Sequence, residues 1–282
     1  MWEGPDLHRL EHLTGLNGAT FVGNNRVLVR VGAGEHQFAF YVHADDKLLS
    51  PWIIITGQYE PRLTRHVVER VKPDSHCIDV GANFGYYACL MAKHAPRGRV
   101  VAIEPNRAVY ELAVDNVFIN QLHERTQVIH GAAGDRHGDI LIHERIGRSG
   151  NTSIAAAGEA FTTFMAEPPE RSALVRCAPL DSLLDRFDGR VDVIKIDVEG
   201  AEPLVIAGAR HTVATNPGLA IFMEWSPGQI AHAGLDVARF CEDLASMGLY
   251  AYALGSGSPE MLSTSELAQL PYQPAVLLTR RR

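Results

Sequence analysis

The chain has 282 residues, of which 46% are hydrophobic, so it can form one large core or a main domain with a small appendage. Its formal net charge of −7, from 26 basic and 33 acidic residues, argues against a protein that binds nucleic acid through phosphates. No stretch approaches the roughly 18 apolar residues of a membrane-spanning helix, and residues 1–15 lack the pattern of a leader sequence. We therefore expect a soluble protein with neither a nucleic-acid nor a membrane partner.

Four cysteines are far apart in the sequence and form no CxxC pair: Cys77, Cys89, Cys177 and Cys241. Cysteines spaced in this way are typical of reduced core residues in a cytoplasmic protein. We therefore expect the protein to be cytoplasmic.

The first 55 residues contain two short strand patterns, at 25–31 and 37–42, and predict a small β-rich cap at the amino terminus. From residue 61 helices and strands alternate. Helices are predicted at 62–71, 84–94 and 107–120, and strands at 76–80, 99–103 and 126–131. Because this alternation is typical of a mostly parallel sheet with helices on both faces, we expect residues 56–282 to form one α/β domain.

The alternation resumes near the carboxyl terminus after an interruption. Strands are predicted at 191–196, 219–223, 249–254 and 275–279, and helices at 202–214 and 235–247. Only an irregular stretch, 255–274, separates the last two strands, so we expect them to pair antiparallel at a sheet edge. The interruption at 147–172 is rich in Gly, Ser, Thr and Ala and predicts either a lid or a disordered insertion.

A glycine-containing turn follows the first strand of the α/β domain, in the segment CIDVGANFGYY (77–87). The strand ends near Asp79, and the turn carries Gly81, Asn83 and Gly85. Glycines let the backbone approach a ligand, and the following helix start offers free N–H groups. Nineteen residues after Gly85, Glu104 ends the next strand, where doubly wound folds use an acid to bind ribose hydroxyls. A nucleotide-like ligand fits this pattern.

Nicotinamide-binding proteins share the spacing from Gly85 to Glu104, but their turn reads GxGxxG. Here the turn reads GANFG, with Asn83 where the second glycine would be, and Asp79 precedes it. An acidic group at that place would repel a pyrophosphate and suits a ligand that carries positive charge. Because of the shared spacing, an NAD(P)-dependent oxidoreductase is the alternative hypothesis.

The octapeptide KIDVEGAE (195–202) places three carboxylates at the end of a predicted strand. The period of two puts Lys195 and Asp197 on one face, so they can pair. Asp197 lies at the carboxyl end of the strand, where open α/β sheets bind ligands, and Glu199 lies in the following turn. Glu202 begins the next helix, where it complements the helix dipole.

Another acid, Glu224, ends the apolar run LAIFME at a second strand end. With Asp197 and Glu199 it could hold a divalent cation such as Mg²⁺, because that ion prefers oxygen ligands. The alternative is a site without metal, in which one of these acids serves as a base or orients the acceptor.

Three segments resemble the signatures of FkbM-type S-adenosylmethionine-dependent methyltransferases: DVGANFGYY (79–87), AIEPN (102–106) and IKIDVEGAEPLVIAGA (194–209). LDSLL (180–184) and GQYEP (57–61) are also similar to the family's pattern. The resemblance covers about residues 55–225. It implies a class I Rossmann-like methyltransferase fold and transfer of a methyl group to a hydroxyl, often on a sugar or a polyketide-type natural product.

The resemblance also implies roles for single residues. Asp79, Gly81, Asn83 and Gly85 would wrap the amino-acid end of S-adenosylmethionine, and Glu104 would hold its ribose. Ala132 or Ala133 would lie near the adenine, and Glu60, within GQYEP, would contact the cofactor.

The predicted catalytic residues are Asp197 and Glu199 as alternative bases, with Lys195 and Glu224 beside them. The expected partner is a small hydroxylated acceptor, whose identity the sequence does not reveal. The oligomeric state cannot be read from the sequence either.

Overall fold

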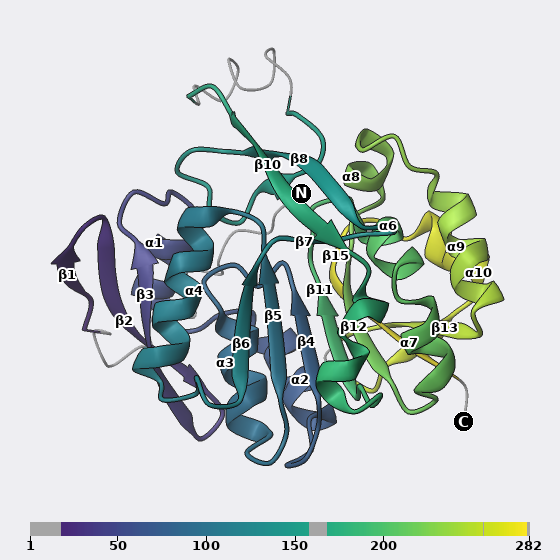
Figure 1. Cartoon of the computed structure of the whole chain (residues 1–282), viewed down its shortest axis with the longest axis horizontal. Coiled ribbons are helices and arrows are strands. Elements are labelled where there is room, and N and C mark those ends of the chain that lie inside the picture. Colours follow the sequence, from purple (N-terminus) through teal and green to yellow (C-terminus); the bar gives the residue numbers. More distant parts are fainter. Residues whose placement is uncertain (1–17, 158–167, 256, 281–282) are drawn as a thin grey trace.

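The computed structural model describes residues 18–157, 168–255 and 257–280, and Figure 1 shows their arrangement. The strands are β1 Thr20–Gly23, β2 Arg26–Ala33, β3 His36–His43, β4 Cys77–Val80, β5 Val100–Glu104, β6 Thr126–His130, β7 Ala132–Ala133, β8 Gly138–Glu144, β9 Thr152–Ser153, β10 Arg171–Ala178, β11 Val193–Ile196, β12 Ala220–Trp225, β13 Leu249–Ala253, β14 Glu260–Leu262 and β15 Gln273–Arg280. The helices are α1 Leu49–Thr56, α2 Pro61–Arg70, α3 Tyr86–His94, α4 Arg107–Ile119, α6 Glu202–Ala207, α7 Arg210–Thr215, α8 Pro227–His232, α9 Val237–Ser246, α10 Thr264–Gln269 and the 3-10 helix η2 Leu180–Phe187.

An eight-stranded sheet in the order β14-β13-β15-β12-β11-β4-β5-β6 forms the centre of the molecule. The strands from β12 to β6 in this order are parallel, which confirms the predicted α/β fold. The chain runs outward in one direction from β4 to β6 and in the other from β11 to β12. The strand order therefore reverses between β4 and β11, and open α/β sheets bind their ligands at such a point.

Alternate residues of the parallel strands face two separate cores. Cys77 and Val193 belong to the core that includes α3, whereas Ile78 and Ile194 belong to the core that includes η2 and α9. Helices therefore cover both faces of the sheet, as the sequence predicts.

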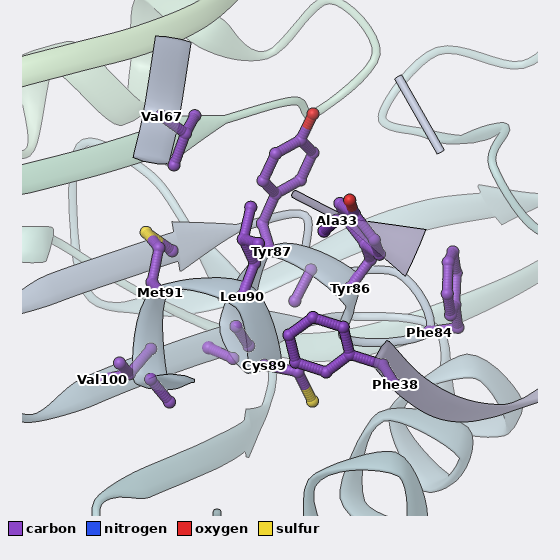
Figure 2. Close-up of a cluster of buried hydrophobic side chains, with 14 of the residues drawn as sticks. Ala33, Phe38, Val67, Phe84, Tyr86, Tyr87, Cys89, Leu90, Met91 and Val100 are labelled. Atoms are coloured by element: carbon purple, nitrogen blue, oxygen red, sulfur yellow. The ribbon is translucent and has the colours of Figure 1, made fainter. Parts of the chain in front are cut away.

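A small antiparallel sheet, β1-β2-β3, precedes the central sheet and confirms the predicted β-rich extension. Figure 2 shows that Ala33 and Phe38 of this sheet lie in one hydrophobic cluster with Phe84 and Leu90 from the region of α3. The helix α1 spans residues 49–56, where no helix is predicted. The extension and the central sheet thus share a core, and the predicted domain boundary at residues 55–56 stays a prediction.

A second small sheet, β7-β10-β8-β9, lies between β6 and β11 in the chain, where the sequence predicts no strand. β8 and β10 form a long antiparallel pair that lies beyond the carboxyl ends of β4 and β5 in Figure 1. Part of the predicted lid or disordered insertion at 147–172 is ordered here, as β9 and the start of β10. Residues 158–167 lie outside the described part, so the lid itself stays a prediction.

The carboxyl-terminal strands β13 and β15 pair antiparallel, as predicted, and β15 lies between β12 and β13. The prediction of an irregular stretch at 255–274 is wrong in part, because β14 forms the sheet edge and α10 follows with a capping box. The helix predicted at 202–214 is broken into α6 and α7 at Gly208. A Cβ at Gly208 would lie 1.9 Å from the carbonyl oxygen of Gly134, so the chain passes too close for a side chain.

Among the described residues, no helix is both long and apolar enough to cross a membrane. All four cysteines are buried and unpaired, as expected for core thiols. The cytoplasmic location stays a prediction.

Candidate active site

The turn after β4 has a conformation that requires glycine at its first position. Gly81 has a φ of +72°, and a Cβ there would lie 1.7 Å from the carbonyl oxygen of Asp197. Gly85 has a φ of +86° and packs against Ala113 of α4. The turn therefore brings the ends of β4 and β11 into contact where the strand order reverses.

Glu104, at the end of β5, is only 4% exposed. Its Oε2 accepts a hydrogen bond from the backbone N–H of Asn83 at 2.8 Å, and its Oε1 accepts one from the N–H of Asn106 at 2.8 Å. Burial raises the pKa of Glu104 to about 7, although both hydrogen bonds lower it. Each carboxylate oxygen has a second lone pair, so Glu104 can still accept hydrogen bonds from a ligand diol.

A pocket lies at the carboxyl ends of β4, β5 and β11. Residues of the segment 149–154 line its other side. The structure places seven of the predicted site residues on its wall: Gly81, Asn83, Glu104, Ala132, Ala133, Asp197 and Glu199. Five predicted residues do not line it: Glu60, Asp79, Gly85, Lys195 and Glu224.

Lys195 lies behind this wall and is almost fully buried. It is the register partner of Asp79 on β4, and its Nζ lies 2.9 Å from Oδ2 of Asp197. The predicted pairing of Lys195 with Asp197 is therefore confirmed. Burial lowers the pKa of Lys195, but Asp197, Asp79 and Glu60 outweigh this effect and hold the pKa above its usual value.

Two more carboxylates lie near Lys195. Both oxygens of Asp79 are buried and accept no hydrogen bond from the described residues, and burial raises the pKa of Asp79 to about 6 against the effect of Lys195. Glu60 accepts a hydrogen bond from the Tyr87 hydroxyl at 2.7 Å, and burial raises its pKa to about 7. Because neither residue lines the pocket, contact of either with the cofactor stays a prediction.

The third group of acids lies at the ends of β11 and β12. Asp197, Glu199 and Glu224 each place one carboxylate oxygen within 4.8 Å of the others. Burial, together with the charges of Asp197 and Glu202, raises the pKa of Glu199 to about 8. Burial also raises the pKa of Glu224 well above its usual value. The structure thus brings together the three acids that the sequence predicts.

Glu202 is fully buried and closes the loop before α6. Its Oε1 accepts hydrogen bonds from the backbone N–H groups of Val198 at 3.2 Å and Gly200 at 3.3 Å. Beyond its predicted place at a helix start, Glu202 therefore fixes the backbone on either side of Glu199.

Sequence reasoning missed Asp46, which connects α1 to the segment beside the pocket. Its Oδ1 accepts hydrogen bonds from the backbone N–H groups of residues 48–50, at 2.7 to 3.2 Å. Its Oδ2 accepts hydrogen bonds from the backbone N–H of Ser149 at 2.8 Å and from its hydroxyl at 2.5 Å. An aspartate shortly before a helix is a capping signal, but it is useful only once a helix is predicted there.

Sequence reasoning also missed the partners of Glu199. Asn151 donates a hydrogen bond to its Oε1 at 3.4 Å, and the Gln229 amide donates to its Oε2. The Ser153 hydroxyl donates to its backbone oxygen at 2.9 Å. These residues lie 30 or more positions from Glu199, so no local pattern connects them to it.

The sequence model of the methyltransferase FkbM domain matches residues 79–246, which is more than half of the chain. The chain belongs to the FkbM methyltransferase family. This confirms the resemblance drawn from the three signatures and does not favour the oxidoreductase alternative. No curated protein matches the sequence of this FkbM methyltransferase.

Three solved structures are similar to this chain at low sequence identity. An O-methyltransferase from Bacillus cereus in complex with SAH is 14% identical, with 79% of this chain and 82% of that chain covered and a TM-score of 0.47. The cofactor-bound Rv0187 from MTB is 13% identical, with 79% and 81% covered and a TM-score of 0.46. M. jannaschii TYW2 in complex with AdoMet is 12% identical, with 92% and 86% covered and a TM-score of 0.42. At these values the likenesses say nothing about the acceptor of this FkbM methyltransferase.

Proposed function

We propose that this FkbM methyltransferase transfers the methyl group of S-adenosylmethionine to a hydroxyl oxygen of a sugar or of a natural product such as a polyketide or glycoside. The observation that supports this most is the single pocket that extends from Glu104 to Asp197 and Glu199. One end offers a carboxylate for a ribose, and the other offers two acids beside the place where an acceptor hydroxyl would lie.

The cofactor half of the site consists of backbone and one carboxylate. The turn Gly81–Gly85 would wrap the amino-acid end of S-adenosylmethionine, because Gly81 and Asn83 of this turn line the pocket. Glu104 would accept hydrogen bonds from the ribose hydroxyls. Ala132 and Ala133, small residues on the pocket wall, would contact the adenine. Glu60 and Asp79 would reach the cofactor's amino group only if the turn moves, since neither lines the pocket.

The acceptor half involves a second pocket, which shares Ser153 and Glu199 with the first. Its lining includes the polar side chains of Asn151, Gln229 and His232. Such groups donate and accept hydrogen bonds, which suits a small acceptor that carries several hydroxyls. We therefore place the acceptor on the Glu199 side of the cofactor.

In the proposed reaction the acceptor oxygen attacks the methyl carbon, and the carbon–sulfur bond breaks. The electron pair of that bond stays on sulfur, which gives S-adenosylhomocysteine, and the hydroxyl proton passes to Asp197 or Glu199. A base works best when its pKa is near the operating pH, and the pKa of Glu199 is about 8. Asp197 is held at 2.9 Å by Lys195, so its carboxylate has a fixed orientation. Either acid can fill the role.

The proposal is tested by incubating the purified protein with methyl-labelled S-adenosylmethionine and a panel of sugars, glycosides and polyketide alcohols. We expect label in an organic product whose NMR spectrum shows a new O-methyl group. Label on nitrogen or carbon, or none with any hydroxylated acceptor although S-adenosylhomocysteine binds, would contradict O-methyl transfer. Binding of NADH in place of S-adenosylhomocysteine would favour the oxidoreductase alternative.

A further inference from the structure

Three carboxylates meet at the ends of two neighbouring parallel strands. Ile196 of β11 lies beside Met223 of β12 in the register, so the next residues, Asp197 just past β11 and Glu224 within β12, lie side by side. Glu199 has a φ of +53°, and the turn brings its carboxylate back to the same place. One oxygen from each of the three acids lies within 4.8 Å of the others.

Glu224 supplies a separate sign of a missing ligand. It is 8% exposed, and its Oε2 is enclosed and accepts no hydrogen bond from the described residues. An enclosed carboxylate oxygen without a partner is costly, because it has lost water and gained nothing in return. A buried acid of this kind is protonated, paired with a cation or bound to a metal.

The ammonium group of Lys195 does not satisfy this oxygen. Its Nζ forms a salt bridge with Oδ2 of Asp197 at 2.9 Å, whereas Oε2 of Glu224 accepts no hydrogen bond from the described residues. A divalent ion between the strand ends would give this oxygen a partner.

We infer that Asp197, Glu199 and Glu224 bind one divalent metal ion beside the methyl-transfer site. Lys195 does not exclude this, since its salt bridge uses Oδ2 of Asp197 and a carboxylate has two oxygens. The proposed ligands are all oxygens, which favours hard ions such as Mg²⁺, Mn²⁺ or Ca²⁺ over Zn²⁺.

The spacing of the three oxygens suits such an ion. Opposite ligands lie about 4.2 Å apart around Mg²⁺ and about 4.8 Å apart around Ca²⁺, which is twice the metal–oxygen distance. The three oxygens fall within 4.8 Å, so the ion needs at most small rotations of the side chains. Three protein ligands leave coordination places for water or for an acceptor hydroxyl.

The role of this ion in catalysis rests on the proposed function, whereas the site itself does not. A bound divalent ion polarises a coordinated hydroxyl and makes its proton easier to remove. It would also hold the acceptor oxygen in line with the methyl group.

The test is a titration of the full-length protein with Mn²⁺, followed by electron paramagnetic resonance of the free ion and repeated at saturation with S-adenosylhomocysteine. S-adenosylhomocysteine lacks the positive sulfonium, so it does not replace the charge of the ion. We expect one saturable Mn²⁺ site, with Mg²⁺ or Ca²⁺ as competitor. Glu224→Gln should weaken Mn²⁺ binding at least about tenfold, whereas Glu242→Gln, on the exposed surface of α9, should leave it unchanged.

If Glu224→Gln does not fold, Glu199→Gln serves in its place, because Glu199 lies in a loop and is less buried. Absence of saturable Mn²⁺ binding would overturn the metal site, and so would Mn²⁺ binding that both variants leave intact. If the protein binds S-adenosylhomocysteine but not Mn²⁺, the metal site is wrong and the proposed methyl transfer is unaffected. If the protein binds Mn²⁺ but not S-adenosylhomocysteine, the metal site is supported and the proposed function is contradicted.

Discussion

Glu104→Ala should weaken binding of the cofactor strongly and change the stability of the fold only slightly. The substitution removes the carboxylate that lines the pocket and accepts hydrogen bonds at 2.8 Å from Asn83 and Asn106. Loss of charge-assisted hydrogen bonds to a ribose costs about 1.5–3 kcal/mol of binding free energy. This corresponds to an increase of roughly 10- to 150-fold in Kd.

The effect on stability should be smaller, because two contributions oppose each other. The variant leaves two backbone N–H groups without an acceptor, at a cost of about 1–3 kcal/mol each. It also removes a buried carboxylate whose pKa is raised from 4.5 to about 7. That shift destabilises the ionised fold by about 3 kcal/mol, as an order of magnitude. We therefore expect a small change in Tm without cofactor.

The sign of the pH dependence follows from the same shift. A carboxyl whose folded-state pKa is raised makes the cofactor-free protein less stable as pH rises from 4.5 through about 7. The ribose hydroxyls bind the ionised carboxylate of Glu104. Below its pKa of about 7, Glu104 must first lose its proton, which weakens binding. The affinity for S-adenosylhomocysteine should therefore increase about tenfold from pH 6 to pH 8. Glu104→Gln should remove most of this change.

The assay is calorimetric titration with S-adenosylhomocysteine, together with thermal unfolding of the cofactor-free protein. Glu111→Ala, on the exposed side of α4, is the matched control and should change neither value. A Kd for Glu104→Ala within about twofold of the wild-type value would refute the placement of the ribose at Glu104.

Gly81→Ala should abolish binding of S-adenosylhomocysteine, because its Cβ would lie 1.7 Å from the carbonyl oxygen of Asp197. Gly138→Ala, which has open space around it, is the control. Normal binding in Gly81→Ala would contradict the turn geometry. Asp46→Ala should lower the free energy of unfolding by about 2 kcal/mol in a urea titration, because it loses the cap of α1 and the contact with Ser149. A change below about 0.5 kcal/mol would show that Asp46 is dispensable. Asp197→Asn should keep its affinity for S-adenosylhomocysteine and lower kcat by about 100-fold, and wild-type turnover would show that Asp197 acts only in structure.

Much of the central sheet could be predicted because its strands are short and apolar and alternate with helices. The turn at Gly81 could be predicted because its glycines stand between a predicted strand and a predicted helix. The pairing of Lys195 with Asp197 follows from the period of two along a strand. These features depend on neighbours in the sequence, which is why the sequence alone reveals them.

The features that the sequence did not reveal depend on distant contacts. Most residues of β8 and β10 are partly or fully exposed, so these strands lack a strong apolar pattern. The helix α1, LSPWIIIT, is apolar without a helical period. The contact of Asp46 with Ser149 joins residues 103 positions apart, and that of Gln229 with Glu199 joins α8 to the loop after β11. Such contacts require the fold to be known first.

Calorimetric titration of the wild-type protein with S-adenosylhomocysteine, with NADH in a parallel cell, tests the methyltransferase site most directly. We expect saturable one-to-one binding of S-adenosylhomocysteine and no heat from NADH. Binding of NADH without binding of S-adenosylhomocysteine would contradict the placement of the cofactor between Gly81 and Glu104.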